Sequence, residues 1–180
     1  MKHQKVIGSI DLTLFTPEIF TDQRGYFLER FNKKIFHQAA GYELDLFQQN
    51  ESLSSKGIVR GLHYQLNNTQ GKLVSVIEGS IIDVAVDIRE NSKTFGEHFV
   101  VPLDGKAKQL LWIPKGYAHG FSVISDQAII SYLVDSPYDQ ESEQTIIWSD
   151  PALGINWGLE EPVVSQKDSE GKLFKDAYYL

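Results

Sequence analysis

Short runs in which apolar and polar residues alternate dominate this sequence and restrict it to β structure. The clearest run is 81–88, where every even position is a branched apolar residue and the odd positions include Asp83 and Asp87. A period of two is that of a β-strand, so we expect a half-buried strand with both carboxylates on its other face. Glu78-Gly79-Ser80, just before this run, predicts a hairpin turn to a strand over 73–77.

Further strand-like segments follow at close spacing and are separated by short turn sequences such as Asp104-Gly105 and Ser125-Asp126. They span residues 99–103, 109–113, 120–124 and 128–134. Many short strands of this kind predict an antiparallel sandwich or barrel. Only residues 32–40 and a short segment after Ser165 have a helical pattern, so we expect an all-β fold with a few short helices.

Length and composition limit the class of protein. At 180 residues without a repeat or linker, the chain is expected to form one domain over 1–180. The absence of cysteine excludes disulfides and thiolate chemistry. A net charge of −7 disfavours nucleic acid as a partner, although a small phosphorylated ligand remains compatible with local cations. There is no apolar signal region at the start and no run long enough to span a membrane, so we expect a cytoplasmic protein.

The segment Arg60-Gly61-Leu62-His63-Tyr64-Gln65, followed by Lys72, is the strongest indication of a functional site. It combines two cations, a histidine, a tyrosine and a glutamine within β-type sequence. These groups suit a pocket that binds an anionic, oxygen-rich ligand and moves protons. Alternatively, His63 is a packed strand histidine, and Arg60 and Lys72 are solvated surface charges.

His119 is followed by a glycine and preceded by Gly116, which indicates close approach of the backbone or a tight bend beside a site; alternatively, His119 is a loop histidine that caps a strand. Two histidines in a β-barrel raise the alternative of a metal-binding cupin, but such sites usually contain His-x-His, which is absent here. We therefore expect no metal. Asp83 and Asp87 either face solvent or, for Asp83, pair with a histidine inside a barrel. Tyr132 lies on an apolar strand face and its hydroxyl needs a partner if it is buried.

The chain resembles the dTDP-4-dehydrorhamnose 3,5-epimerases, a family of cupin-type jelly rolls. The resemblance covers nearly the whole length and rests on many ordered motifs rather than on one. These motifs lie at residues 22–29, 48–52, 57–65, 71–74, 84–89, 92–96, 112–121 and 148–157.

The resemblance implies roles for individual residues and a reaction without a cofactor. It makes His63 the base, Asp168 the carboxylate that orients it, Tyr132 the acid on the opposite face of the sugar, and Lys72 the cation at the C4 carbonyl. It also implies a homodimer and a dTDP-4-dehydro-6-deoxy sugar as substrate. The positions at which the family binds this substrate are Arg24, Glu29, Gln48, Gln49, Asn50, Arg60, Lys72, His119, Tyr138, Glu143 and Lys167.

Two positions differ from the family pattern. Gln49 replaces the aspartate of a Gln-Asp-Asn run, where the backbone is the expected contributor, and Leu133 stands where many members have lysine. Neither change removes a catalytic group. The resemblance implies conversion of dTDP-4-dehydro-6-deoxy-D-glucose to dTDP-4-dehydro-L-rhamnose. The alternatives are an epimerase that inverts C3 only, a metal-dependent cupin enzyme and a non-enzymatic sugar-binding jelly roll.

Overall fold

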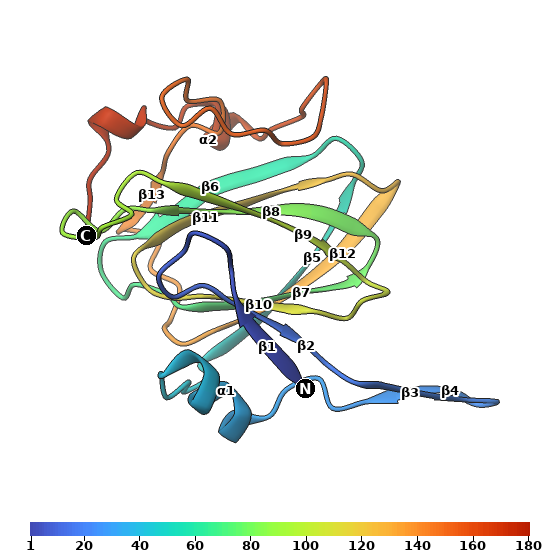
Figure 1. Cartoon of the computed structure of the whole chain (residues 1–180). Coiled ribbons are helices and arrows are strands. Elements are labelled where there is room, and N and C mark those ends of the chain that lie inside the picture. Colours follow the sequence, from blue (N-terminus) through green and yellow to red (C-terminus); the bar gives the residue numbers. More distant parts are fainter.

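The computed structural model describes all 180 residues and consists mainly of two antiparallel sheets that face each other (Figure 1). The six-stranded sheet has the order β1 (Lys2–Lys5), β2 (Thr13–Thr16), β10 (Leu110–Ile113), β7 (Lys72–Glu78), β12 (Gln127–Val134) and β5 (Gln48–Ser55). The five-stranded sheet has the order β13 (Glu143–Thr145), β6 (Val59–Gln65), β11 (Tyr117–Val123), β8 (Ser80–Asp87) and β9 (His98–Asp104). This arrangement is a jelly roll and confirms the predicted all-β class.

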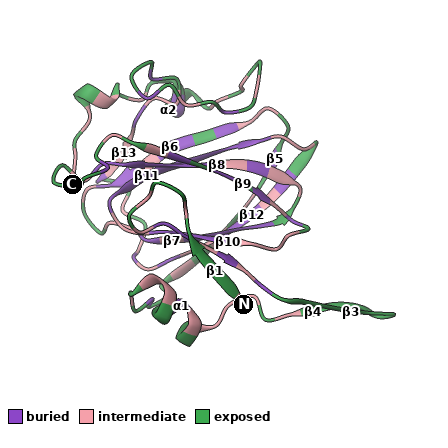
Figure 2. Cartoon of the chain, in the orientation of Figure 1, coloured by how far each residue is buried: buried purple, intermediate pink, exposed green.

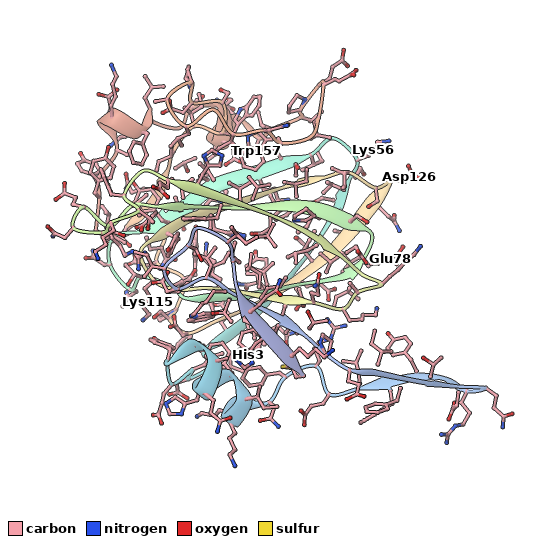
Figure 3. All side chains as sticks on the ribbon, in the orientation of Figure 1. His3, Lys56, Glu78, Lys115, Asp126 and Trp157 are labelled. Carbon is pink, nitrogen blue, oxygen red and sulfur yellow. The ribbon has the colours of Figure 1, made fainter.

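Three groups of apolar side chains hold the layers together. The largest lies between the two sheets and includes Val74 and Ile130 from one sheet and Ile81 and Phe121 from the other. Removal of such side chains from water stabilises the fold by about 1.5–3 kcal/mol each. The side chains drawn in Figure 3 fill much of the space between the sheets. The core therefore occupies one part of the interior and leaves the remainder for polar side chains.

The outer face of each sheet is also covered. The segment from about Ile146 to the C-terminus packs over the five-stranded sheet and contributes Trp157, whose indole donates to the carbonyl of Trp148 at 2.9 Å. It contains the short helix α2 (Gln166–Ser169) and the 3-10 turn η1 (Phe174–Asp176). Helix α1 (Lys33–Ala40) packs Phe36 against Trp112 on the outer face of the six-stranded sheet.

Both predicted helices are confirmed, and their ends follow capping rules. The Asn32 side chain accepts from the backbone N–H groups of Lys34 and Ile35, and Gly41 ends α1 with φ 67°. Asparagine at the N-cap and glycine in the left-handed region are common helix boundaries. At α2, the Ser165 side chain accepts from the backbone N–H of Asp168. This cap fixes the backbone that carries a predicted site residue.

Two sequence-based predictions about β8 are wrong. The strand is buried on both faces rather than half-buried, because its even positions lie beneath the C-terminal segment and its odd positions face the other sheet. In addition, Glu78-Gly79-Ser80 is not a hairpin turn, since β7 and β8 belong to different sheets. At Gly79 a Cβ atom would lie 2.0 Å from the carbonyl oxygen of Gln127. The glycine therefore permits a sharp crossing between sheets.

The predicted close backbone approach near His119 is confirmed. A Cβ atom on Gly120 would lie 2.7 Å from the carbonyl oxygen of Arg60, and one on Gly61 would lie 2.5 Å from the Cα of Gly120. Strands β6 and β11 meet here across an irregularity in their register. Two facing glycines thus allow the strands that carry His63 and His119 to lie side by side.

A hairpin formed by β3 (Ile19–Asp22) and β4 (Gly25–Leu28) extends away from the two sheets (Figure 1). It pairs with no other strand of the chain. Figure 2 shows it as almost entirely exposed, and Phe27 retains 71% of its accessible surface. Such exposed aromatic side chains indicate a surface that contacts something else.

No helix of the chain has the length and apolar character needed to cross a membrane.

Candidate active site

Two adjoining cavities of about 270 and about 550 Å³ lie between the sheets. His63, Lys72 and Tyr132 line both of them and therefore stand where the cavities meet. The smaller cavity also takes in Gln48, Asn50, Tyr138 and Glu143. The larger cavity also takes in Arg60, His119, Lys167 and Asp168. Residues predicted from distant parts of the sequence are thus brought into one continuous space.

His63 and Asp168 form a hydrogen-bonded pair. The Nε2 atom of His63, on β6, lies 2.6 Å from Oδ1 of Asp168, on α2. The other carboxylate oxygen accepts the backbone N–H of Gly61 at 3.3 Å. Burial by itself would raise the pKa of Asp168, but the hydrogen bonds from His63, Gly61 and Ser165 hold it below its usual value. Asp168 is therefore ionised, and a group that contacts its carboxylate oxygens has to be a hydrogen-bond donor.

An ionised Asp168 sets the tautomer of His63. Because a carboxylate accepts only, Nε2 carries the proton and Nδ1 is left with its lone pair. The pair has the geometry in which a carboxylate orients a general base and stabilises the imidazolium that forms. Asp168 is 3% exposed, so water competes little for this contact.

Tyr132 approaches from the opposite sheet. It lies on β12, whose neighbouring inward residues Ile130 and Val134 are fully buried in the core. Burial raises the pKa of the Tyr132 phenol, and the positive charge of Arg60 partly offsets this. The phenol is therefore protonated at neutral pH. Since His63 belongs to the facing sheet, a ligand between the sheets has a base on one side and an acid on the other.

Lys72 is a partly buried cation at the junction of the cavities. Its ammonium group donates one hydrogen bond, to the backbone carbonyl of His63 at 3.4 Å, and forms no ion pair. Burial lowers the pKa of Lys72 to about 8, while the charges of Asp83 and Glu143 act in the opposite direction. A desolvated ammonium with spare donors is well suited to stabilise a negative charge that develops on a ligand.

His119 pairs with Asp83, as one of the two sequence alternatives predicted. Its Nε2 atom lies 2.9 Å from Oδ2 of Asp83. His119 stands opposite His63 in the β6–β11 register, yet each histidine bonds to its own carboxylate. No group of three or more histidine, aspartate or glutamate side chains is arranged to hold a metal ion. Asp87 is also buried, but it bonds to Arg89 and lines neither cavity.

Charged and aromatic side chains surround the opening. Glu143 accepts hydrogen bonds from Lys167 and, at 2.7 Å, from the hydroxyl of Tyr138. Burial would raise the pKa of Glu143, but these two donors keep it low. Arg60 is exposed, and its Nε donates to Ser54 at 3.0 Å, which leaves its terminal nitrogens for an anion.

Three of the predicted binding residues lie outside the cavities of the single chain. Gln49 is exposed and bonds to Ser131 on the outer face of its sheet, because alternation along β5 turns it away from Gln48 and Asn50. Arg24 lies in the β3–β4 hairpin, where it pairs with Asp22 at 2.5 Å. Glu29 follows that hairpin and accepts from Asn32 at 3.1 Å.

Sequence reasoning also missed residues that line the smaller cavity. They are Thr69, Gln70, Gly116, Tyr117 and Leu180. Tyr64 and Gln65, which also line this cavity, were part of the segment predicted to form the pocket but were given no individual role. Leu180 gave no local signal, because only the path of the C-terminal segment brings it to the cavity.

Fold and site together define the class of protein: a jelly-roll enzyme that moves protons on a polar, anionic ligand. The sequence profile of the dTDP-4-dehydrorhamnose 3,5-epimerases matches residues 9–176. A dTDP-4-dehydrorhamnose 3,5-epimerase from Shigella flexneri is 46% identical over 171 residues, which cover 94% of each chain. The chain belongs to the dTDP-4-dehydrorhamnose 3,5-epimerase family.

Solved structures agree with this assignment and with a cupin-type fold. A dTDP-6-deoxy-D-glucose-3,5-epimerase from Legionella pneumophila, in complex with dTDP-4-keto-L-rhamnose, has 45% identity and a TM-score of 0.92. The match covers 97% of this chain and 94% of that one. A 3'-monoepimerase from Streptomyces bikiniensis, in complex with dTDP-quinovose, has 30% identity and a TM-score of 0.89, with 96% and 88% covered.

Proposed function

We propose that this protein epimerises dTDP-4-dehydro-6-deoxy-D-glucose at C3 and C5 to give dTDP-4-dehydro-L-rhamnose. One observation carries the proposal: His63 and Tyr132 stand on facing sheets, with Lys72 beside them at the junction of the cavities. Membership of the 3,5-epimerase family and the high identity to the Shigella enzyme support it. The lower identity to the 3'-monoepimerase favours inversion of both carbons over inversion of C3 alone.

The chemistry follows from the acidity of protons beside a ketone. Nδ1 of His63 removes the proton from C3, and the electron pair of the broken C–H bond moves onto the C4 oxygen as an enolate. The Lys72 ammonium stabilises this oxyanion, which is more negative than the ground-state carbonyl oxygen. Tyr132 then delivers its hydroxyl proton to the opposite face of C3 and regains one from solvent, while His63 releases its proton to solvent. The same cycle at C5 completes the reaction.

Proton NMR of dTDP-4-dehydro-6-deoxyglucose in heavy water, with metal-stripped protein, tests this function. We expect deuterium at both C3 and C5, and an L-rhamnose product once a reductase is coupled. Exchange at C3 alone would establish the monoepimerase alternative. Exchange that needs added metal would establish a metal-dependent cupin enzyme, and no exchange at either carbon would leave a sugar-binding jelly roll.

Lys72 is expected to impose an alkaline limit on activity. Its protonated form predominates below a pKa of about 8, so turnover should fall as the pH rises through that value. Lys72→Ala should cut turnover by about 10²-fold or more, because the enolate loses its counter-charge. The measurement is the pH profile of kcat, with Lys56→Ala as a control that removes an exposed lysine. Wild-type turnover in Lys72→Ala would remove this residue from the mechanism.

We also propose a homodimer in which the β3–β4 hairpin of each subunit completes the site of the other. Arg24 and Glu29 occupy substrate positions of the family, yet in the single chain they lie on or just after a hairpin that projects from the body. The hairpin exposes Phe20, Tyr26 and Phe27. Exchange of such an element between identical subunits would bury these aromatic rings and carry Arg24 to a cavity.

Mixing two inactive variants tests this assembly. Arg24→Ala and His63→Ala should each be impaired as homodimers, whereas a mixed dimer has one site with an intact His63 and an intact Arg24. We therefore expect partial recovery of activity after subunit exchange, measured in the deuterium assay. Sedimentation should give about twice the chain mass of 20.4 kDa. A monomeric mass, or no recovery despite proven exchange, would contradict the proposal.

A further inference from the structure

Gln65 is a buried glutamine whose side-chain amide joins two loops of the chain. It is the last residue of β6, is 5% exposed, and lines the smaller cavity. Its Nε2 atom donates to the carbonyl of Asn68 at 2.8 Å and to that of Pro137 at 3.2 Å. Its Oε1 atom accepts the backbone N–H of Asp139 at 3.2 Å. Both amide hydrogens are used in these contacts, so Gln65 has no donor left for a ligand.

Two of these hydrogen bonds lie on either side of Tyr138. Pro137 precedes it and Asp139 follows it in the loop between β12 and β13, so Gln65 binds the backbone on both sides of this one residue. The hydroxyl of Tyr138 donates to Glu143 at 2.7 Å, and Glu143 stands opposite Gln65 in the β6–β13 register. The backbone around Tyr138 and its hydroxyl are thus held by the same pair of strands.

Tyr138 depends on such support because it lies on a loop and has little packing of its own. It is 53% exposed, lines the smaller cavity and occupies a substrate position of the family. An exposed side chain on an unsupported loop has to be ordered when a ligand binds, and this ordering lowers the affinity. A loop that is fixed before the ligand arrives avoids that cost.

We propose that Gln65 is a positioning residue that fixes the Tyr138 loop at the opening of the smaller cavity and so sets the affinity for the nucleotide sugar. The proposal rests on the function proposed above and adds to it a residue that acts through Tyr138. Gln65 also lies two residues from His63 on β6, so its hydrogen bonds tie the loop to the strand that carries the proposed base. The alternative is that Gln65 stabilises the fold and has no effect on binding.

Gln65→Met tests the proposal, since methionine has a similar length but no N–H group. If the loop takes its binding position in about one tenth of the molecules, KM should rise about tenfold. The value of kcat should stay within about twofold of wild type, because only binding shared by the ground state and the transition state is lost. Gln127→Met removes an exposed glutamine that lines neither cavity and is the matched control. An unchanged KM, or a fall in kcat as large as the rise in KM, would overturn the proposal.

A double substitution asks whether Gln65 acts through Tyr138. Tyr138→Ala removes the side chain that the loop presents to the cavity. Addition of Gln65→Met to this variant should therefore raise KM no further, because the two residues contribute to one interaction. Effects on KM that multiply would show that Gln65 acts by another route and would overturn the proposal.

Hydrogen exchange tests the position of the loop without any turnover. The backbone N–H of Asp139 is protected by its bond to Oε1 of Gln65, so its exchange, followed by NMR, should be faster in Gln65→Met than in wild type. An unchanged exchange rate would overturn the proposal. Gln65→Glu keeps the acceptor and loses both donors, and it is the second variant. Failure of both variants to fold would also overturn the proposal, since the role of Gln65 would then be structural.

Calorimetry with dTDP separates this proposal from the epimerase function. Gln65→Met should bind dTDP about tenfold more weakly than wild type, even if the wild-type protein proves inactive on the sugar. That result would reject the epimerase function alone. Faster exchange at Asp139 with unchanged affinity for dTDP would overturn the role of Gln65 and leave the function intact. No binding of dTDP by the wild-type protein would overturn both.

Discussion

His63→Ala is expected to abolish deuterium exchange at both C3 and C5. The substitution removes the nitrogen that accepts the substrate proton, and the other histidine of the site, His119, lines only the larger cavity and does not stand at the junction with Lys72 and Tyr132. A positioned general base contributes about 10²–10⁴-fold to a rate, and the same imidazole serves both carbons. We therefore expect the exchange rate at each carbon, followed by proton NMR in heavy water, to fall by at least about 10²-fold.

An exposed histidine provides the control for this experiment. His37 lies on the solvent side of α1, so His37→Ala should exchange at the wild-type rate. Circular dichroism and the thermal midpoint should show that His63→Ala is folded. An exchange rate within tenfold of wild type in His63→Ala would contradict the role of His63 as the base. Tyr132 would then be the next candidate for the base.

Tyr132→Phe is expected to separate exchange from inversion. The phenylalanine ring keeps the contact with the apolar core but removes the proton donor on the six-stranded sheet. His63 can still remove a proton and return a deuteron to the same face, so exchange persists while the inverted product falls by about 10²-fold or more. The two quantities come from one NMR time course, as the rate of label uptake and the rate of product formation.

Tyr178→Phe is the matched control, because Tyr178 is more than half exposed and lies outside both cavities. It should leave exchange and inversion unchanged. If Tyr132→Phe lost exchange and inversion to the same extent, the assignment of His63 as the base and Tyr132 as the acid would be refuted.

Local patterns in the sequence predicted the strands from β7 to β12, but they gave no limits for β1 to β6 or for β13. The alternation over 81–88 and 128–134 corresponds to β8 (Ser80–Asp87) and β12 (Gln127–Val134), within a residue at most ends. Periodicity depends on the backbone and on which faces are buried, so it can be detected within one segment. It does not identify the partner strand. For this reason the predicted hairpin at Gly79 was wrong, and β7 and β8 belong to opposite sheets.

Part of the candidate site is also local. Arg60, His63 and Lys72 come from neighbouring stretches, and their mixture of charges within β-type sequence already indicated a polar pocket. Asp168 is different, because it lies 105 residues from His63 and its neighbours form only a short helix. The family resemblance named this partner, whereas residue pattern alone did not. Its contact depends on how the C-terminal segment crosses the five-stranded sheet.

The sequence by itself therefore determined the β class, the approximate limits of β7 to β12 and the residue types of the chemistry, since these depend on alternation and on side-chain functional groups. Tertiary structure decided which sheet each strand joined, and so placed His63 and Tyr132 on facing sheets. It also decided that Asp168 reaches His63 and that the β3–β4 hairpin leaves the body of the chain. The physical reason is that burial and long-range electrostatics arise only when segments distant in sequence pack together.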